Sequence, residues 1–233
     1  MTMIWKETAE FVGNRRSLGV FGFAVLLMGI IPTIATRHMG SGTPETLRVL
    51  FDVFYVIFAT LIVVANTASD LVLHERVGRT LDYLLATRLP DSAIFLGKVI
   101  VSALMGYLAA LVAIALQIGV TAALQGHGFS WIYLADPIGR IVALGITACL
   151  AVYASVVGTF VALRIGDQRS AYLLTVLSIG VILLPLILGW IPIETTTAWF
   201  ADAALVFAGI AVALAAIGVL LFKRELLVLN LQE

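Results

Sequence analysis

Charged residues are scarce in this chain: aspartate, glutamate, lysine and arginine make up only 12% of its 233 residues, whereas hydrophobic residues make up 61%. A soluble domain of this size needs roughly a quarter of its residues charged to cover its surface. The scarcity therefore excludes an ordinary soluble domain and predicts that most of the surface faces lipid. The net charge is zero, so the basic surplus typical of nucleic-acid-binding proteins is also missing, and we expect no nucleic-acid partner.

The signatures of enzymes and cofactor sites are missing too. The single cysteine, Cys149, excludes an internal disulfide bond and a thiolate metal cage. Gly97 and Lys98 do not form a phosphate loop, because valine follows them and no glycine lies five positions before Gly97. The H-E-x-x-H and G-x-S-x-G motifs are absent, and the three histidines fall in predicted loops. We therefore predict no enzymatic activity, no metal site and no cofactor in this chain.

Long apolar runs occupy most of the sequence. A helix needs about 20 apolar residues to cross a hydrocarbon core of about 30 Å. The windows that meet this requirement are residues 18–36, 51–69, 99–123, 141–163, 171–190 and 203–222. They predict an all-α integral membrane protein with six transmembrane helices, in one transmembrane domain over residues 1–233. For the first window a secretory signal is the alternative, although the run is longer than the usual signal core.

Lysine and arginine are unevenly distributed between the two sets of predicted loops. With a cytoplasmic N-terminus, only Arg37, Arg48 and Arg140 of the 14 basic residues lie outside. An even number of spans then returns the tail, residues 223–233, to the cytoplasm. We therefore expect a multi-pass protein of the cytoplasmic (inner) membrane with both termini inside.

Residues 1–17 carry the pattern of an amphipathic helix. The apolar face would hold Ile4, Trp5, Thr8, Phe11 and Val12, and the opposite face Lys6, Glu7 and Glu10. We expect this helix to lie along the inner membrane surface; an irregular tail that dips into the headgroups is the alternative.

Polar residues within the predicted spans are few and chiefly uncharged. Candidates for a substrate path are Asn66, Tyr107, Gln117 and Tyr153, although for each an interhelical hydrogen bond is the alternative. Ala151, Ser155 and Gly158 form a small-residue stripe suited to close helix packing. The charges lie near span ends, which disfavours a carrier that binds its coupling ion at the midplane.

The longest predicted cytoplasmic connection covers residues 70–98. Val77, Leu81, Leu84 and Leu85 recur at helical spacing in it, which predicts a short amphipathic helix. Pro90 ends that helix, and Asp91 or Ser92 can cap the next one. The apolar face either docks on a partner or packs beneath the bundle at the membrane surface.

The residues of this connection carry a family resemblance. Residues 75–87 read Glu-Arg-Val-Gly-Arg-Thr-Leu-Asp-Tyr-Leu-Leu-Ala-Thr, followed by Pro90 and by Gly97-Lys98. This pattern resembles the first cytoplasmic loop of type-2 ABC transporter permeases. It departs from the family at Val77, which replaces an acid, at Arg79, which replaces a glycine, and at Arg88, which replaces a proline.

The resemblance implies the transmembrane permease subunit of an ATP-driven exporter. It implies a coupling helix that contacts a separate ATPase subunit through Glu75, Arg76, Arg79, Thr80, Leu81, Asp82, Leu84 and Leu85. ATP and Mg would bind to that ATPase, and a second copy of this chain or a similar permease would complete the pore within membrane lipid. Two other functions stay open: an ion-gradient-driven secondary transporter, and a non-transporting membrane assembly or immunity component.

Overall fold

The computed structural model describes residues 3–38, 45–77, 90–125, 141–165, 167–187 and 197–221, and within these ranges the regular structure is helical. The elements are α1 (Met3–Gly13), α2 (Arg15–His38), α3 (Glu45–Val77), α5 (Asp91–Gln125), the π-helix η1 (Ile141–Ile146), α8 (Thr147–Arg164), α9 (Gln168–Ile187) and α10 (Thr197–Leu221). The predicted all-α class is confirmed for this part of the chain.

In the described part of the chain, four helical segments are long and apolar enough to cross a membrane. They are Arg15–Ala35 in α2, Phe54–Leu73 in α3, Ser92–Leu124 in α5, and Leu144–Arg164 in η1 and α8. The protein is therefore a multi-pass membrane protein. The fifth and sixth predicted windows overlap α9 and α10, and α10 contributes a shorter apolar segment, Ala208–Leu220, to the described residues.

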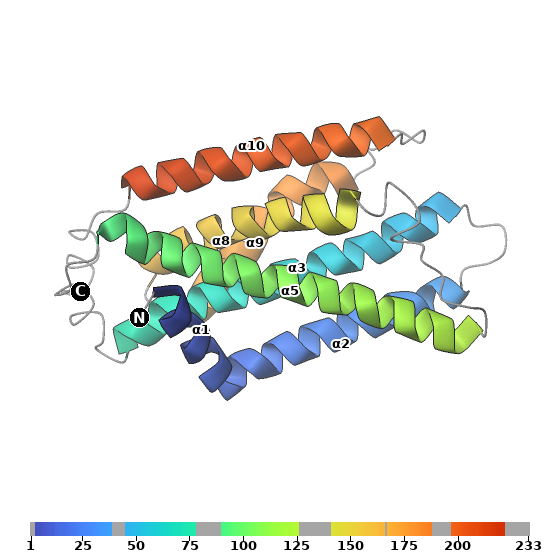
Figure 1. Ribbon diagram of the computed structural model, residues 1–233, viewed down its shortest axis with the longest axis horizontal. Helices are drawn as coiled ribbons and strands as arrows, with labels where there is room; N and C mark the ends of the chain where they lie inside the picture. Colours follow the sequence, from blue (N-terminus) through green and yellow to red (C-terminus); the bar gives the residue numbers. More distant parts are fainter. Residues whose placement is uncertain are drawn as a thin grey trace.

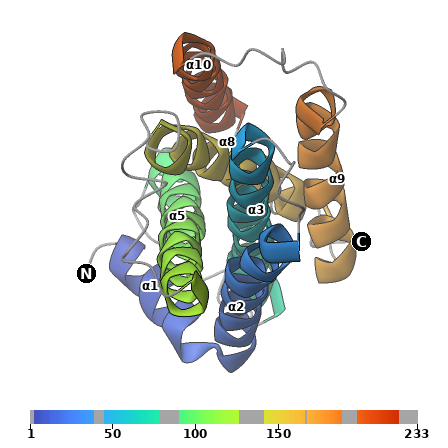
Figure 2. The same ribbon diagram turned by 90° about the vertical axis from the view of Figure 1, so that its right-hand side faces the viewer.

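The long helices run side by side, and α3 lies at the centre of the bundle (Figures 1 and 2). It packs against α2, α5, α8 and α9. The last helix, α10, lies at the edge and packs on α8, η1 and α5, whereas the short α1 crosses the bundle obliquely near the end of α3 and the start of α5. Segments far apart in sequence therefore meet at the end of the bundle where α1 lies.

Two helices, α3 and α5, extend farthest beyond the windows predicted for them. The third helix, α3, continues to Val77, because Val72 and Leu73 are buried against Ala162 and Ala171 of α8 and α9. The next helix, α5, begins directly after Pro90, whose carbonyl accepts hydrogen bonds from the Ala93 and Ile94 amides. Proline suits a helix start because its missing N–H would have no partner within the helix there. Both ends of the expected 70–98 connection are thus helical, and residues 78–89 lie outside the described part of the chain.

Small residues bring the central helices close together. A Cβ atom on Gly106 would lie 2.0 Å from Val64 Cγ2, so α5 and α3 touch at this glycine. A Cβ on Gly158 would lie 3.0 Å from the Ala68 Cβ and 3.2 Å from Thr175 Cγ2. Ala151 and Ser155, the other members of the predicted small-residue stripe, are also buried. The role of this stripe in close packing is confirmed.

The first helix turns one residue of its predicted polar face, Glu7, toward the bundle. Phe11 is buried, but so is Glu7, which the pattern assigns to the polar outer face. Ile4, Trp5 and Val12 of the predicted apolar face are exposed. The physical reason is that Glu7 has a cationic partner inside the bundle, which offsets the cost of burying its charge.

Candidate functional site

A buried ion pair joins three helices near one end of the bundle. Lys98, in the third turn of α5, donates from Nζ to Glu7 Oε1 of α1 over 3.1 Å. The same ammonium group donates to the Leu71 carbonyl oxygen of α3 over 2.7 Å. Glu7 is 0% exposed and Lys98 4% exposed. A single side chain therefore fastens α1 to both α3 and α5.

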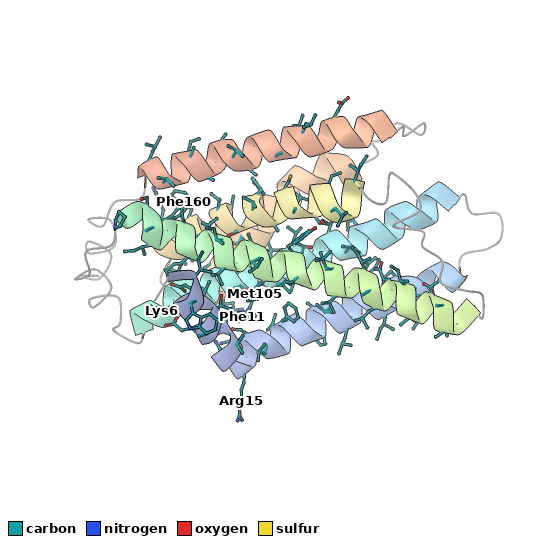
Figure 3. All side chains as sticks on the ribbon, viewed as in Figure 1. Lys6, Phe11, Arg15, Met105 and Phe160 are labelled. Carbon is teal, nitrogen blue, oxygen red and sulfur yellow. The ribbon has the colours of Figure 1, made fainter. Side chains whose placement is uncertain are left out.

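The surroundings of this ion pair are apolar. Phe11, one turn after Glu7, belongs to a cluster that includes Val63, Leu71, Val101 and Met105; Figure 3 shows Phe11 beside Met105. Charges buried in such surroundings persist only when they are paired and hydrogen-bonded, because the loss of hydration is costly. The Glu7–Lys98 pair thus defines the position of α1 on the bundle.

A second polar network surrounds Asp70, which is half-buried on α3. Its carboxylate accepts hydrogen bonds from the Ser17 hydroxyl, the Gln168 side-chain amide and, at 3.4 Å, the Asn66 amide. Gln168 Oε1 in turn accepts from Arg16 Nη1 over 3.2 Å. The starts of α2 and α9 are thereby fastened to α3 through one carboxylate.

Two smaller polar contacts hold the helix α5. The Ser102 and Ser155 hydroxyls are hydrogen-bonded to each other, and Ser155 Oγ also donates to the Val99 carbonyl over 2.6 Å, which joins α5 to α8. Gln117 Nε2 donates to the Met28 carbonyl of α2 over 3.1 Å. Interhelical hydrogen bonds of this kind are a usual way to hold apolar helices together in lipid.

The start of α9 is capped by Asp167, an exposed residue outside the membrane-spanning segments. Its Oδ2 accepts from the Ser170 amide over 2.9 Å and from the Ser170 hydroxyl over 2.8 Å. These two bonds stabilise the carboxylate and lower the pKa of Asp167 below its usual value. The cap fixes the end of α9 that carries Gln168.

The four predicted substrate-path residues occupy different surroundings. Tyr153 is buried in an apolar cluster against which Tyr107 packs. Asn66 contacts Asp70, and Gln117 contacts the α2 backbone. Only the two tyrosines share a cluster, so a path through all four residues stays a prediction.

Of the predicted ATPase-coupling residues, Glu75 and Arg76 lie in the last turn of α3. The remaining six, Arg79, Thr80, Leu81, Asp82, Leu84 and Leu85, lie outside the described residues.

The buried pair of Glu7 and Lys98 was not predicted from the sequence, which placed Glu7 on an outer face and Lys98 at the end of a loop. The two residues are 91 positions apart, so no local pattern relates them. A signal was nevertheless present: Lys98 is followed directly by the apolar run of the third span, where a charge requires a partner. Among the described residues, no group of three or more histidine, cysteine, aspartate or glutamate side chains could hold a metal ion.

Comparison with known proteins leaves the family open: no protein-family model matches the sequence, and no curated protein matches it.

Proposed function

We propose that this chain is the transmembrane subunit of an ATP-driven exporter in the cytoplasmic (inner) membrane. It would cross this membrane six times, with both termini in the cytoplasm. A separate ATPase would bind the connection between α3 and α5 and would hold the ATP and Mg. A second copy of the chain, or a similar permease, would complete the substrate path. The proposal rests on one observation, the residue pattern from Glu75 to Lys98.

The surroundings of this segment support the proposal. The connection leaves α3 at Val77 and enters α5 at Asp91, so its two ends are continuous with long helices of the bundle. Lys98 lies two turns inside α5 and holds both α3 and α1. A force applied by a partner to the connection would thus pass into α3, α5 and α1 together.

An ion-gradient-driven carrier is the second candidate, because the bundle contains ionisable groups shielded from solvent. Glu7 and Lys98 are buried and Asp70 is half-buried, and such groups in membrane proteins often serve ion or proton movement. Each has a structural partner within the bundle, which favours a role in holding helices. In everted vesicles, transport that needs ATP and persists after addition of a protonophore supports the exporter. Transport that proceeds without ATP and stops when a protonophore is added supports the carrier.

Membrane topology is the first test of the proposal. Cys149, the single cysteine, is replaced by alanine, and Tyr83→Cys or Ser130→Cys is introduced singly. A membrane-impermeant maleimide should label position 83 only in everted vesicles and position 130 only in intact cells. Labelling of position 83 from outside the cell would contradict both the orientation and the exporter.

Partner binding is the second test. The tagged full-length chain is purified from its native membranes in a mild detergent, and we expect an ATPase with a phosphate loop to copurify. Leu84→Asp and Leu85→Asp place a charge on the apolar face and should abolish copurification and transport without preventing membrane insertion. Leu84→Met conserves the apolar character and approximate volume of the side chain, so it should retain the ATPase. If the aspartate variants keep the ATPase and its transport-linked activity, the coupling role is wrong.

A further inference from the structure

Arginine side chains gather at the end of the bundle where α2 and α9 begin. Arg15 and Arg16 are the first two residues of α2, Arg169 is the second residue of α9, and all three are exposed. Arg16 and Gln168 are hydrogen-bonded although they are 152 positions apart, so the two helix starts lie side by side. We call Arg15, Arg16 and Arg169 the basic rim.

The position of Arg16 in the basic rim is fixed from inside the bundle. The half-buried carboxylate of Asp70 accepts a hydrogen bond from the side-chain amide of Gln168. With its amide nitrogen held there, Gln168 presents Oε1 to Arg16 Nη1. Ser17, the next residue of α2, also donates to Asp70 and keeps this helix start in place. The Arg16 guanidinium is thus oriented by an exposed hydrogen bond to Gln168, which is itself held by a part-buried hydrogen bond to Asp70.

The charge of this region favours an anionic ligand. Arg164, exposed in the last turn of α8, lies four residues before Gln168 and adds a fourth arginine. Asp70 and Asp167 are the carboxylates that the described contacts place at these two helix starts, and both already accept hydrogen bonds from protein groups: Asp70 from Ser17 and Gln168, and Asp167 from Ser170. Four arginines against two engaged carboxylates leave a positive surface, and guanidinium groups suit phosphate through paired N–H donors.

The exposed side chains of α1 indicate the level of this surface relative to lipid. Trp5 is 61% exposed and Val12 56% exposed, on the short helix that directly precedes Arg15. Exposed tryptophan on an amphipathic helix is typical of the boundary between headgroups and acyl chains. Figure 3 shows Arg15 pointing away from the helices. The exposed Trp5 on the helix before Arg15 therefore favours a place for the basic rim at the level of the lipid headgroups.

We propose that the basic rim binds the phosphate of an anionic phospholipid headgroup, with Arg16 held in position by Gln168 and Asp70. The lipid would bridge the start of α2 and the start of α9. This assignment depends on the membrane character of the protein and not on the ATPase partner, so the failure of either proposal leaves the other standing.

The test measures lipid binding by the full-length protein in a neutral detergent. Phosphatidylglycerol or phosphatidylcholine is titrated into the sample, and bound lipid is counted by native mass spectrometry. We expect retention of phosphatidylglycerol over phosphatidylcholine. Each of Arg15→Gln and Arg16→Gln should weaken phosphatidylglycerol binding about fivefold, the factor that corresponds to about 1 kcal/mol per basic residue at an anionic surface.

Two further variants distinguish a specific phosphate-binding site from non-specific electrostatic attraction. Arg16→Lys keeps the charge but loses the planar guanidinium group and its paired N–H donors, so it should also lower the preference for phosphatidylglycerol. Lys6→Gln removes one positive charge from the neighbouring α1, where Lys6 is paired with Glu10 at 3.5 Å, and should change binding by less than twofold. Equal binding of both lipids, an equal loss in Lys6→Gln, or no loss in the two arginine-to-glutamine variants would overturn the proposal. Displacement of the bound lipid by millimolar inorganic phosphate would identify a free anion as the ligand and would overturn it as well.

Discussion

Lys98 Nζ lies 3.1 Å from Glu7 Oε1, and this contact joins the first helix of the chain to the interior of the bundle. Neither side chain reaches solvent to any significant extent. Because two charges buried together depend on each other, removal of one leaves the other without compensation. The pair is therefore most informative when it is changed one residue at a time and then together.

Single replacement of either partner should destabilise the protein strongly. We expect Glu7→Gln and Lys98→Met each to lower the free energy of unfolding, by up to roughly 3–5 kcal/mol. The double variant Glu7→Gln with Lys98→Met should lose much less than the sum of the single changes, because no buried charge remains. Thermal unfolding of the purified protein in detergent measures these differences. Additive losses would show that the two residues act independently.

Gly106 should tolerate no side chain. A Cβ there would lie 2.0 Å from Val64 Cγ2 and 3.2 Å from the Thr60 carbonyl oxygen, so Gly106→Ala must separate α5 from α3. We expect a loss of about 1–3 kcal/mol in the free energy of unfolding. Gly119 is the matched control on the same helix, because a Cβ there meets nothing within 4 Å; Gly119→Ala should leave stability nearly unchanged. Val64→Ala should partly rescue Gly106→Ala, and the absence of rescue would contradict the proposed contact.

Gln117 should contribute to stability and not to transport, if its contact with the Met28 carbonyl is its main role. Gln117→Leu removes this interhelical bond and should cost about 0.6 kcal/mol, the average for such bonds in membranes. Thermal unfolding measures the loss, and transport by the same variant provides the contrasting readout. A large fall in transport with little change in stability would instead favour the predicted substrate path.

Asp167 should make the start of α9 sensitive to acid. Its hydrogen bonds with Ser170 lower the pKa of its carboxyl in the folded protein relative to the unfolded chain. The stabilisation is therefore fully present above the unfolded-state pKa of about 3.9 and is lost as the pH falls through the lower folded-state value. Thermal unfolding between pH 7 and pH 3 should show this loss in the native protein. Asp167→Ser keeps a capping oxygen that does not titrate, so this contribution should no longer depend on pH. An unchanged acid dependence in that variant would assign it to other groups.

The sequence predicted the helical class because apolar runs of membrane-spanning length leave few alternatives. It also predicted the small-residue stripe, since Ala151, Ser155 and Gly158 recur at helical spacing on one span. It could not predict the inner face of α1, because the periodicity of apolar residues says nothing about a lysine 91 positions away. The length of α3 was also missed. Hydropathy falls after Ser69, whereas packing of Val72 and Leu73 on α8 and α9 extends the helix.

The contacts of the polar groups were only partly predictable from the sequence. Asn66 was selected as a polar residue within a span, and its contact with Asp70 depends on helical spacing that the sequence does contain. The role of Asp70 depends on Ser17 and Gln168, which come from two other helices. Contacts between distant helices follow from the arrangement of the bundle, and one sequence does not determine that arrangement by local rules.

The apolar segment of α5, Ser92–Leu124, contains 33 residues, which as a helix measure about 50 Å. A hydrocarbon core of about 30 Å, crossed at the largest usual tilt of about 40°, accommodates only about 40 Å of it. About two turns of apolar helix must therefore emerge from the acyl chains, and water would meet them unless protein covered them. Glu7 of α1 pairs with Lys98 in the third turn of α5, and Phe11 packs with Val101 and Met105 one and two turns further on, so the N-terminal helix covers part of the first half of α5. Loss of α1 would expose this apolar surface of α5, and the protein would then be prone to aggregation as well as less stable.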